Sequence, residues 1–419
     1  MSSANIPSHN LTVKKEFKLS SFLVKWEMIL VYILVLINVI LMVSKPNYYF
    51  AANTIPSIIQ SGMDLACMVL GMIFILLLGD IDVSVASIMV VSGMVMGLLK
   101  DAGMNDFIVV VCGLLAGVLC GLFNGVLVAK VGMPAVIVTI ATSSLFRGIV
   151  KIRLDVNVLK NFPRWFQDLA WDNILGIPVA LLFFLALAAV FAVVLHKGKF
   201  GRKLYMIGNN PVASQYSGVD VARTKVLVFA IMGLMAGISA IFFVGRMGGG
   251  LSSTMGKGYE MNVIAIAVLG GVSTSGGKGK VYGPVIATLI MAFLSYTMGL
   301  LGVDTNTRQI FTGIILIIAV LIPYFNKHLI DEIKLKLLYA DNKNIEAINV
   351  RCQEEVAEIR HKVKALQSDT TLSAADKAAK TKAYQDKIAA LTKKCAQTTK
   401  AMKAELKQQN VKVSKSLSK

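Results

Sequence analysis

Long apolar runs, separated by short polar or glycine-rich breaks, fill the first 326 residues of the chain. A helix needs roughly 20 apolar residues to cross the hydrocarbon core of a bilayer. Ten runs approach that length, at residues 22–43, 55–78, 83–99, 107–131, 135–152, 177–195, 226–244, 261–272, 281–301 and 310–324. This pattern predicts an all-α polytopic membrane protein with about ten transmembrane helices. The run at 261–272 is the shortest, so we expect a broken or half-spanning helix there.

After residue 326 the apolar residues follow a seven-residue spacing. One series comprises Ile345, Cys352, Ile359 and Leu366, and a second follows a polar break at 368–371, with members Tyr384, Ile388, Leu391, Cys395 and Met402. Two heptad helices joined by a short break predict a helical hairpin with antiparallel coiled-coil arms. Folding the arms about residue 371 sets Cys352 opposite residue 390 and not Cys395, so we expect no disulfide.

These patterns divide the chain into an N-terminal segment (1–21), a transmembrane domain (22–326) and a basic coiled-coil tail (327–419). The front 326 residues contain 23 Lys and Arg and 13 Asp and Glu, whereas the tail alone contains 20 and 11. So apolar a front part is neither a single water-soluble domain nor a disordered chain. We expect this front part to lie in a lipid bilayer. We expect no nucleic-acid partner.

Basic residues set the predicted orientation. With ten spans, the lysine-rich start, the 197–225 loop and the tail fall on one side, which the positive-inside rule makes the cytoplasm. Arg147, Lys151, Arg153, Lys160 and Arg164 fall outside and oppose this assignment. We therefore expect a multi-pass protein of the bacterial-type cell membrane with both termini cytoplasmic.

The loop from 153 to 176 places four aromatic residues among charges. An amphipathic segment at the outer interface and an aromatic belt that anchors two helix ends explain it equally well.

Several features argue against enzyme chemistry. The five cysteines are scattered without a CxxC spacing, and the four histidines flank the apolar runs, so neither a metal site nor a catalytic residue is predicted. The Gly276–Gly279 turn lacks the earlier glycine and the Ser or Thr after its lysine that a phosphate-binding loop requires. We expect no cofactor, and no ATP site of that kind.

The 197–225 loop contains a candidate docking element. Its segment 201–211 is polar and rich in turn residues, Asn210 and Pro211 can start a short helix, and Gly218 can end it. A short helix in a cytosolic loop with no apolar face of its own to bury fits a groove on another protein. The alternative is a solvated connector.

Polar residues inside or between the runs are the other candidates. Asp82 and Ser84 can cap the helix that starts near residue 83, or line a solute path, or touch a partner. Glu260 can cap the 261–272 helix. Asp64 and Arg147 are the ionisable groups within spans, and Asn124 and Thr139 belong to a larger set of amide and hydroxyl residues there. Such a lining suits a neutral polar solute and lacks the acid chain of a proton-driven pump.

Four stretches resemble motifs of one family, the membrane subunits of ABC importers for ribose, autoinducer-2 and related sugars. The stretches are Gly71-Met72 with Gly79–Ser87; Asn124-Gly125 with Pro134–Thr139 and Arg147-Gly148; Gly201–Asn210 with Gly218; and Glu260–Gly279. The resemblance covers about residues 50–325. The chain departs from the family at Ala86 and Asp80, where glycine is usual, and in its long tail, which is not a family feature.

The resemblance implies a permease that works with a second permease copy, a separate ATPase and an extracytoplasmic solute-binding protein. It implies that the 201–218 loop docks in the ATPase, through the motif residues Gly201, Arg202, Gly208, Asn210, Pro211 and Gly218. The pathway or motif candidates are Asp64, Asp82, Ser84, Asn124, Thr139, Arg147 and Glu260.

Three other functions stay open. A branched-chain amino-acid ABC permease would keep the ATPase but needs contacts for a charged solute. A secondary transporter would need no ATPase and should have broken helices with intramembrane acids in both halves. A membrane scaffold that presents its coiled-coil tail would transport nothing.

Overall fold

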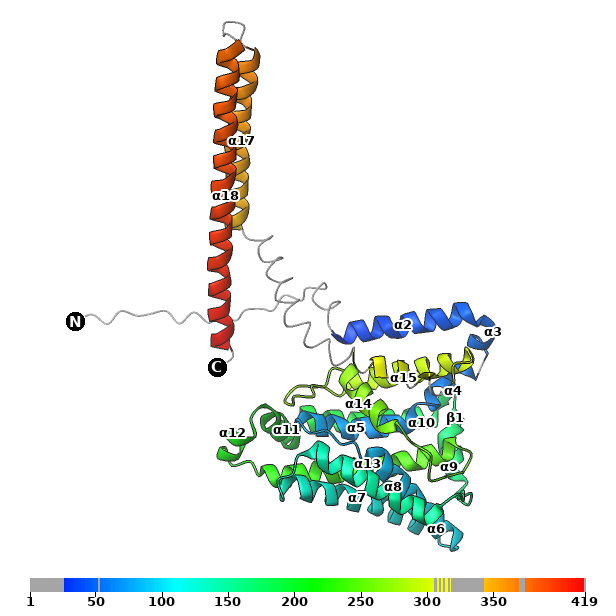
Figure 1. The fold of residues 1–419 in the computed structure, drawn as a ribbon. Coiled ribbons are helices and arrows are strands. Elements are labelled where there is room, and N and C mark those ends of the chain that lie inside the picture. The colour runs from blue at the N-terminus through cyan, green and yellow to red at the C-terminus, as the bar shows by residue number, and fades with distance from the viewer. Residues whose placement is uncertain are drawn as a thin grey trace, which may run out of the picture. The chain divides into compact units, whose positions relative to one another are not determined.

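The computed structural model describes residues 26–51, 53–304, 307–308, 310–311, 313–315, 317, 343–368 and 374–417 (Figure 1). The chain divides into two compact units, Met1–Val320 and Leu321–Lys419, which we describe separately. The predicted N-terminal segment 1–21, most of the predicted run at 310–324, and residues 327–342 of the tail lie outside the described residues.

The first unit is helical. Its elements are α2 (Trp26–Ser44), α3 (Pro46–Tyr49), α4 (Thr54–Gln60), α5 (Met63–Leu77), α6 (Val85–Asp101), α7 (Asp106–Ala129), α8 (Ala135–Leu154), α9 (Trp165–Trp171), β1 (Asn173–Ile174), β2 (Ile177–Pro178), α10 (Val179–His196), α11 (Lys199–Asn209), α12 (Pro211–Tyr216), α13 (Val221–Arg246), α14 (Tyr259–Leu269) and α15 (Tyr282–Leu300). The two short strands form an antiparallel hairpin between α9 and α10.

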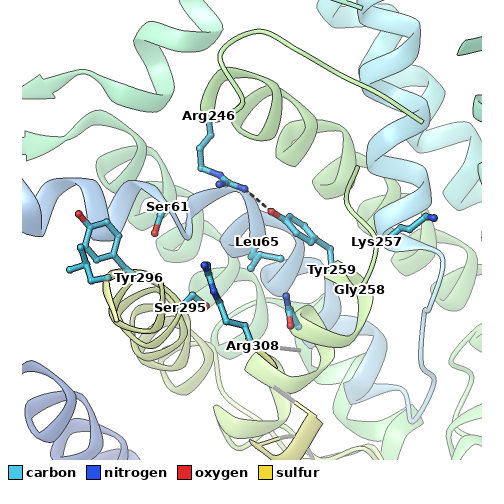
Figure 2. Close-up of a pocket in the computed structure, with 12 residues that line it drawn as sticks. Ser61, Leu65, Arg246, Lys257, Gly258, Tyr259, Ser295, Tyr296 and Arg308 are labelled. Atoms are coloured by element: carbon cyan, nitrogen blue, oxygen red, sulfur yellow. Dashed lines mark hydrogen bonds between the residues drawn. The ribbon is translucent and has the colours of Figure 1, made fainter. Parts of the chain in front are cut away.

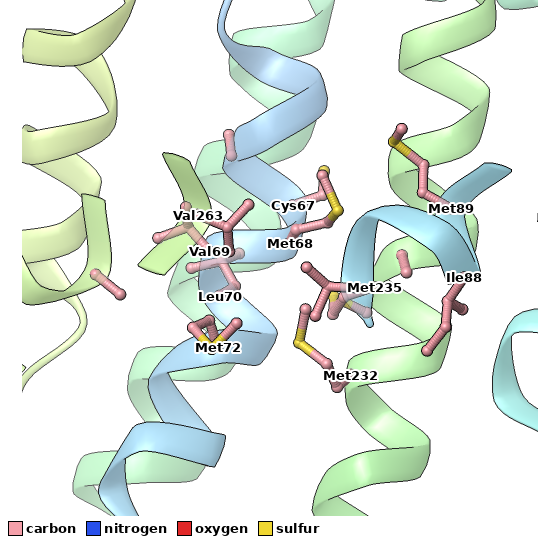
Figure 3. Close-up of a cluster of buried hydrophobic side chains, with 14 of the residues drawn as sticks. Cys67, Met68, Val69, Leu70, Met72, Ile88, Met89, Met232, Met235 and Val263 are labelled. Atoms are coloured by element: carbon pink, nitrogen blue, oxygen red, sulfur yellow. The ribbon is translucent and has the colours of Figure 1, made fainter. Parts of the chain in front are cut away.

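Helices α5 and α6 form the centre of the unit. Every residue of α5 except Leu65 is buried, and α6 is buried continuously from Val85 to Met94. Both pack against α13. Methionines from the three helices meet there, and their flexible side chains fill an irregular core (Figure 3). A helix that is apolar on all sides is typical of a protein core or a membrane span.

Glycines let α7 and α13 approach closely. A Cβ atom at Gly117 would lie 2.5 Å from the Gly233 carbonyl, and one at Gly121 would collide with the Phe229 carbonyl. Small residues at helix contacts are characteristic of membrane bundles, where backbone proximity replaces the hydrophobic effect as the source of packing energy.

The described helices support five or six membrane spans. Helices α7, α8, α10, α13 and α15 are long and apolar enough to cross a bilayer, and α4 with α5 counts as a sixth span with a 42° bend. The sequence pattern predicts one continuous run at 55–78, but the chain bends at Ser61-Gly62, where Gly62 packs closely against Ala292. Helix α14 is as short as the pattern predicts. The count of ten spans stays a prediction.

The second unit is a helical hairpin of α17 (Lys343–Ser368) and α18 (Ala374–Leu417), which pack against each other. The structure pairs Cys352 with Cys395 in a disulfide, with the two Cα atoms 6.5 Å apart. The expectation that these cysteines do not meet is therefore wrong. The register of the arms follows the packing of the heptad positions, to which both cysteines belong, and not the midpoint of the connection.

Candidate functional site

A buried polar cluster surrounds the connection between α5 and α6. Asp82 Oδ1 accepts hydrogen bonds from the Ser84 backbone N–H (2.8 Å) and the Ser84 hydroxyl (2.6 Å), and Asn124 Nδ2 of α7 donates to Ser84 Oγ at 2.7 Å. Thr139 of α8 donates to the Ile81 carbonyl at 3.3 Å. Four predicted candidates from two helices and one connection thus meet in one place. We call Asp82, Ser84, Asn124 and Thr139 the inner cluster.

The inner cluster retains unused hydrogen-bonding capacity. Asp82 and Asn124 are fully buried, and neither Asp82 Oδ2 nor Asn124 Oδ1 has a partner among the described residues. Ser84 is the N-cap residue of α6, and its side chain makes no capping hydrogen bond to the helix. Asp82 accepts the N–H of Ser84 and so fixes the start of α6 from outside the helix. Close by in sequence, Asp80 forms an ion pair with Lys225 of α13 (2.7 Å).

A second cluster lies at the other end of α5. Asp64, whose side chain is fully buried, forms an ion pair with Arg246 at the end of α13: Arg246 Nη2 and Nε lie 2.8 and 3.2 Å from Asp64 Oδ2. Arg246 Nη2 also donates to Tyr259 Oη at 2.6 Å (Figure 2). We call Asp64, Arg246 and Tyr259 the outer cluster. The pairing explains how an acid is tolerated inside an apolar span.

Arg246 and Tyr259 carry no motif signal, so the sequence pattern does not single them out. One signal was available: a buried Asp64 needs a cationic partner, and Arg246 lies two residues after the apolar run at 226–244.

Arg147 and Glu260 hold the segment between α13 and α14. Arg147 donates from Nη1 to the Met255 carbonyl and from Nη2 to the Gly256 carbonyl, both at 2.9 Å. Glu260 Oε1 accepts the Gly258 N–H at 3.2 Å, which is the contact of a helix cap on α14. Both side chains therefore fix the loop that leads into the short helix.

A pocket of about 450 Å³ adjoins the outer cluster. Its walls come from the α4–α5 bend, the end of α13, the start of α14, the last two turns of α15 and Arg308 (Figure 2). The lining is mixed, with hydroxyl, amide and guanidinium groups beside aromatic and aliphatic side chains. Such a mixture is typical of small-molecule sites. Among the described residues, no group of three or more His, Cys, Asp or Glu suits a metal ion.

The predicted docking element consists of two helices. Asn210 caps α12 by accepting the Ala213 N–H at 3.0 Å, Pro211 occupies its first turn, and Gly218 follows it with φ +80°. Val212 and Tyr216, one turn apart, expose 62% and 88% of their surface. The short helix is thus present as predicted. It presents an apolar face outward, which the sequence pattern did not reveal.

The preceding segment is a helix, α11, and not the turn-rich stretch that its composition suggests. Leu204 and Ile207 are buried against the bundle, and Gly201 packs closely against the Leu195 carbonyl. Arg202 is exposed and donates to the Lys197 carbonyl at 3.3 Å. Tertiary burial of these apolar residues overrides the turn preference of the glycines.

Gly208 joins α11 to the centre of the bundle. A Cβ atom at Gly208 would collide with the Leu77 carbonyl and the Gly277 N–H, and Gly277 N itself donates to the Leu77 carbonyl at 2.9 Å. Tyr205 Oη donates to the Gly279 carbonyl at 2.6 Å. Three motif stretches that are far apart in the sequence therefore converge at the end of α5.

Comparisons with known proteins identify membrane permeases as relatives of this chain. A family profile described as "Branched-chain amino acid transport system / permease component" matches residues 54–320. The D-allose transport system permease protein AlsC of Escherichia coli (strain K12) is 32% identical over 308 residues, 73% of this chain and 94% of that protein. The ribose import permease protein RbsC of Bacillus subtilis (strain 168) is 32% identical over 291 residues, 69% and 90% of the two chains. No solved structure matches the chain.

The apolar helix bundle with its buried polar clusters defines a multi-pass membrane permease. The chain belongs to the family of ABC importer permease components that the profile describes. It is a transport subunit and not an enzyme. A further relative, the L-arabinose transport system permease protein AraH of Escherichia coli (strain K12), is 34% identical over 65% of this chain and 81% of that protein.

Proposed function

We propose that the chain is the membrane-spanning subunit of an ATP-driven importer for a neutral polar solute of the sugar class. Ribose, allose and arabinose stand in the names of its relatives, and the buried polar groups of its bundle are mostly hydroxyls and amides. The observation that carries the proposal is the contact of Gly208 with the Leu77 carbonyl, because it connects an exposed helix pair to the buried centre of the bundle.

We propose the following coupling route. The exposed apolar face of α12 docks into a groove of a separate ATPase. Movement of α12 passes to α11, to which it is directly joined, and from α11 through the Gly208–Leu77 contact to α5. Because α5 is buried along its length, a shift of its end changes the packing of the whole bundle. Gly201, Arg202, Gly208, Asn210, Pro211 and Gly218 are the proposed coupling residues.

Helix α8 is the proposed wall of the solute path. Ser144 and Ala141 are exposed on it, beside half-buried Ser143 and Gly148, and hydroxyl and small residues of this kind suit either a polar path or a helix contact. A second permease copy, identical or homologous, placed against α8 would enclose that face. Asp82, Ser84, Asn124 and Thr139 lie behind it and fix the connection from which α6 starts.

The proposed topology has ten spans and cytoplasmic termini. It places α11 and α12 on the cytoplasmic side with the ATPase. It places α9 and the end of α8, which carries Arg147, on the outer side, where an extracytoplasmic solute-binding protein delivers the solute. Helices α2, α6 and α14 and the segment at 310–324 supply the spans beyond the five or six that helix length supports.

The description of the matching profile names branched-chain amino acids, which makes an amino-acid permease the second candidate. Uptake assays with both solute classes separate the two. The three sugar permeases named above favour sugars.

Purification of the chain from native membranes in mild detergent, followed by mass spectrometry of its companions, tests the proposal. We expect an ABC ATPase to copurify, and a second permease if the pair is heteromeric. The double variant Val212→Ser/Tyr216→Ser should lose the ATPase, because it removes the exposed apolar face of α12. The matched variant Ala213→Ser, a polar change on the neighbouring face, should keep it. Absence of any ATPase, under conditions that preserve a control importer, would favour a secondary transporter or a scaffold.

A further inference from the structure

The pocket beside the outer cluster is built from groups that recognise hydroxylated molecules. Ser61, Asn262 and Ser295 line it with two hydroxyls and an amide, from the α4–α5 bend, α14 and α15 respectively. Hydroxyl and amide groups both donate and accept. The Ser61 hydroxyl already donates to the Ile58 carbonyl at 2.6 Å and so offers an acceptor, whereas Asn262 and Ser295 can pair with a sugar hydroxyl of either orientation. Tyr259 and Tyr296 add flat apolar surfaces that end in a hydroxyl.

The arginine of the pocket is held in position. Arg246 uses Nε and Nη2 for Asp64 and Tyr259, which leaves Nη1 without a hydrogen bond among the described residues. Because Asp64 is fully buried behind it, the guanidinium cannot swing away without breaking an ion pair in an apolar environment. Arg246 is thus a fixed hydrogen-bond donor at the pocket wall.

The fixed arginine of the pocket wall is neutralised by its ion pair. Asp64 offsets the charge of Arg246, and Arg308 is engaged through Nε with the Val303 carbonyl at 2.9 Å. Lys257 is exposed at the rim. Arg308 and Lys257 are also cationic, so inorganic phosphate is included as a probe for an anion. The fixed donors and acceptors of the wall suit a polyol.

We infer that this pocket is a subsite for a neutral, monosaccharide-sized polyol, formed within a single permease chain by the α4–α5 bend, α13, α14 and α15. The assignment rests on the proposed importer function. A volume of about 450 Å³ is within the usual range for small-molecule sites. The bend between α4 and α5 and the start of the short helix α14 both border this space.

Protection of an engineered thiol tests the subsite directly. Ser295 is exposed within the pocket, so the thiol of Ser295→Cys in the purified complex should react with N-ethylmaleimide. Mass spectrometry of the peptide that carries position 295 measures the rate of labelling. D-Ribose, D-allose and L-arabinose are the probes. At least one should slow labelling about tenfold once its concentration is about ten times its Kd. Thr254→Cys, exposed and outside the pocket, is the control and should be unaffected.

A second substitution shows whether protection arises from binding in the pocket. In the Ser295→Cys background, Asn262→Leu removes an amide at nearly constant volume and should raise the sugar concentration for half-protection about tenfold. Met261→Leu, an exposed neighbour outside the pocket, should leave it unchanged. A dextran polymer at equal mass concentration controls for viscosity.

The outcomes separate the two proposals. If an ATPase copurifies and ATP-dependent sugar uptake is measured, but no sugar protects position 295, the subsite is overturned and the importer function stands. Protection by L-leucine or inorganic phosphate and not by the sugars overturns the polyol class. Protection by a sugar that Asn262→Leu does not weaken overturns the assignment of the pocket.

Discussion

Gly208 has no room for a side chain, and we predict that this makes it a residue of energy coupling. In Gly208→Ala the new methyl group collides with the Leu77 carbonyl, so α11 must move away from the end of α5. We expect the reconstituted complex to keep ATP hydrolysis and to lose most solute uptake per ATP consumed. Gly250→Ala is the control, because a Cβ atom there has only ordinary contacts at 3.7 Å. An unchanged ratio of uptake to hydrolysis in Gly208→Ala would refute the coupling route.

We predict that the Asp64–Arg246 ion pair stabilises the folded helix bundle. Asp64→Asn leaves a largely buried guanidinium without its counter-charge, which we expect to destabilise the bundle by about 3–5 kcal/mol. Thermal resistance of the detergent-purified protein, followed by size-exclusion chromatography, measures the effect. Asp106→Asn breaks the more exposed pair with Lys100 and should cost about 0–1 kcal/mol. Equal losses in the two variants would contradict the buried character of the Asp64 pair.

At the scale of elements, a disulfide cross-links the two arms of the tail hairpin. A cross-link between Cys352 and Cys395 closes a loop of 43 residues, which by chain entropy stabilises the hairpin by about 4 kcal/mol. We expect the full chain, purified without reductant, to yield one disulfide-linked peptide pair, and maleimide to label both cysteines only after reduction. A cytoplasmic location of the tail would keep the pair reduced in growing cells. Full labelling of both thiols without reductant, also after exposure to an oxidant, would exclude the disulfide.

Two helices of the bundle are irregular. The bend between α4 and α5 and the short helix α14 break the regular pattern of spans, and both border the pocket. A break exposes backbone and polar side chains at membrane depth, which is tolerated where they line a cavity inside the protein.

For the whole molecule, we predict that the tail is dispensable for transport. The bundle and the tail form separate compact units, and the family match ends at residue 320. Truncation after residue 326 should therefore preserve ATPase copurification and ATP-dependent uptake in reconstituted vesicles. A scaffold that works through its tail would instead lose its role entirely on this truncation, while a folding defect would show as loss of the monodisperse complex.

The sequence by itself determined the class of molecule, because hydrophobic length and heptad spacing act locally and need no tertiary information. It also determined the α12 helix, since Asn210, Pro211 and Gly218 specify its ends through their own backbone preferences. It did not reveal that Asp64 pairs with Arg246, that Gly208 lies against Leu77, or that Cys352 meets Cys395. These contacts join residues far apart in the chain, and only the packing of α5 against α11 and α13, or of one hairpin arm on the other, decides which side chains meet.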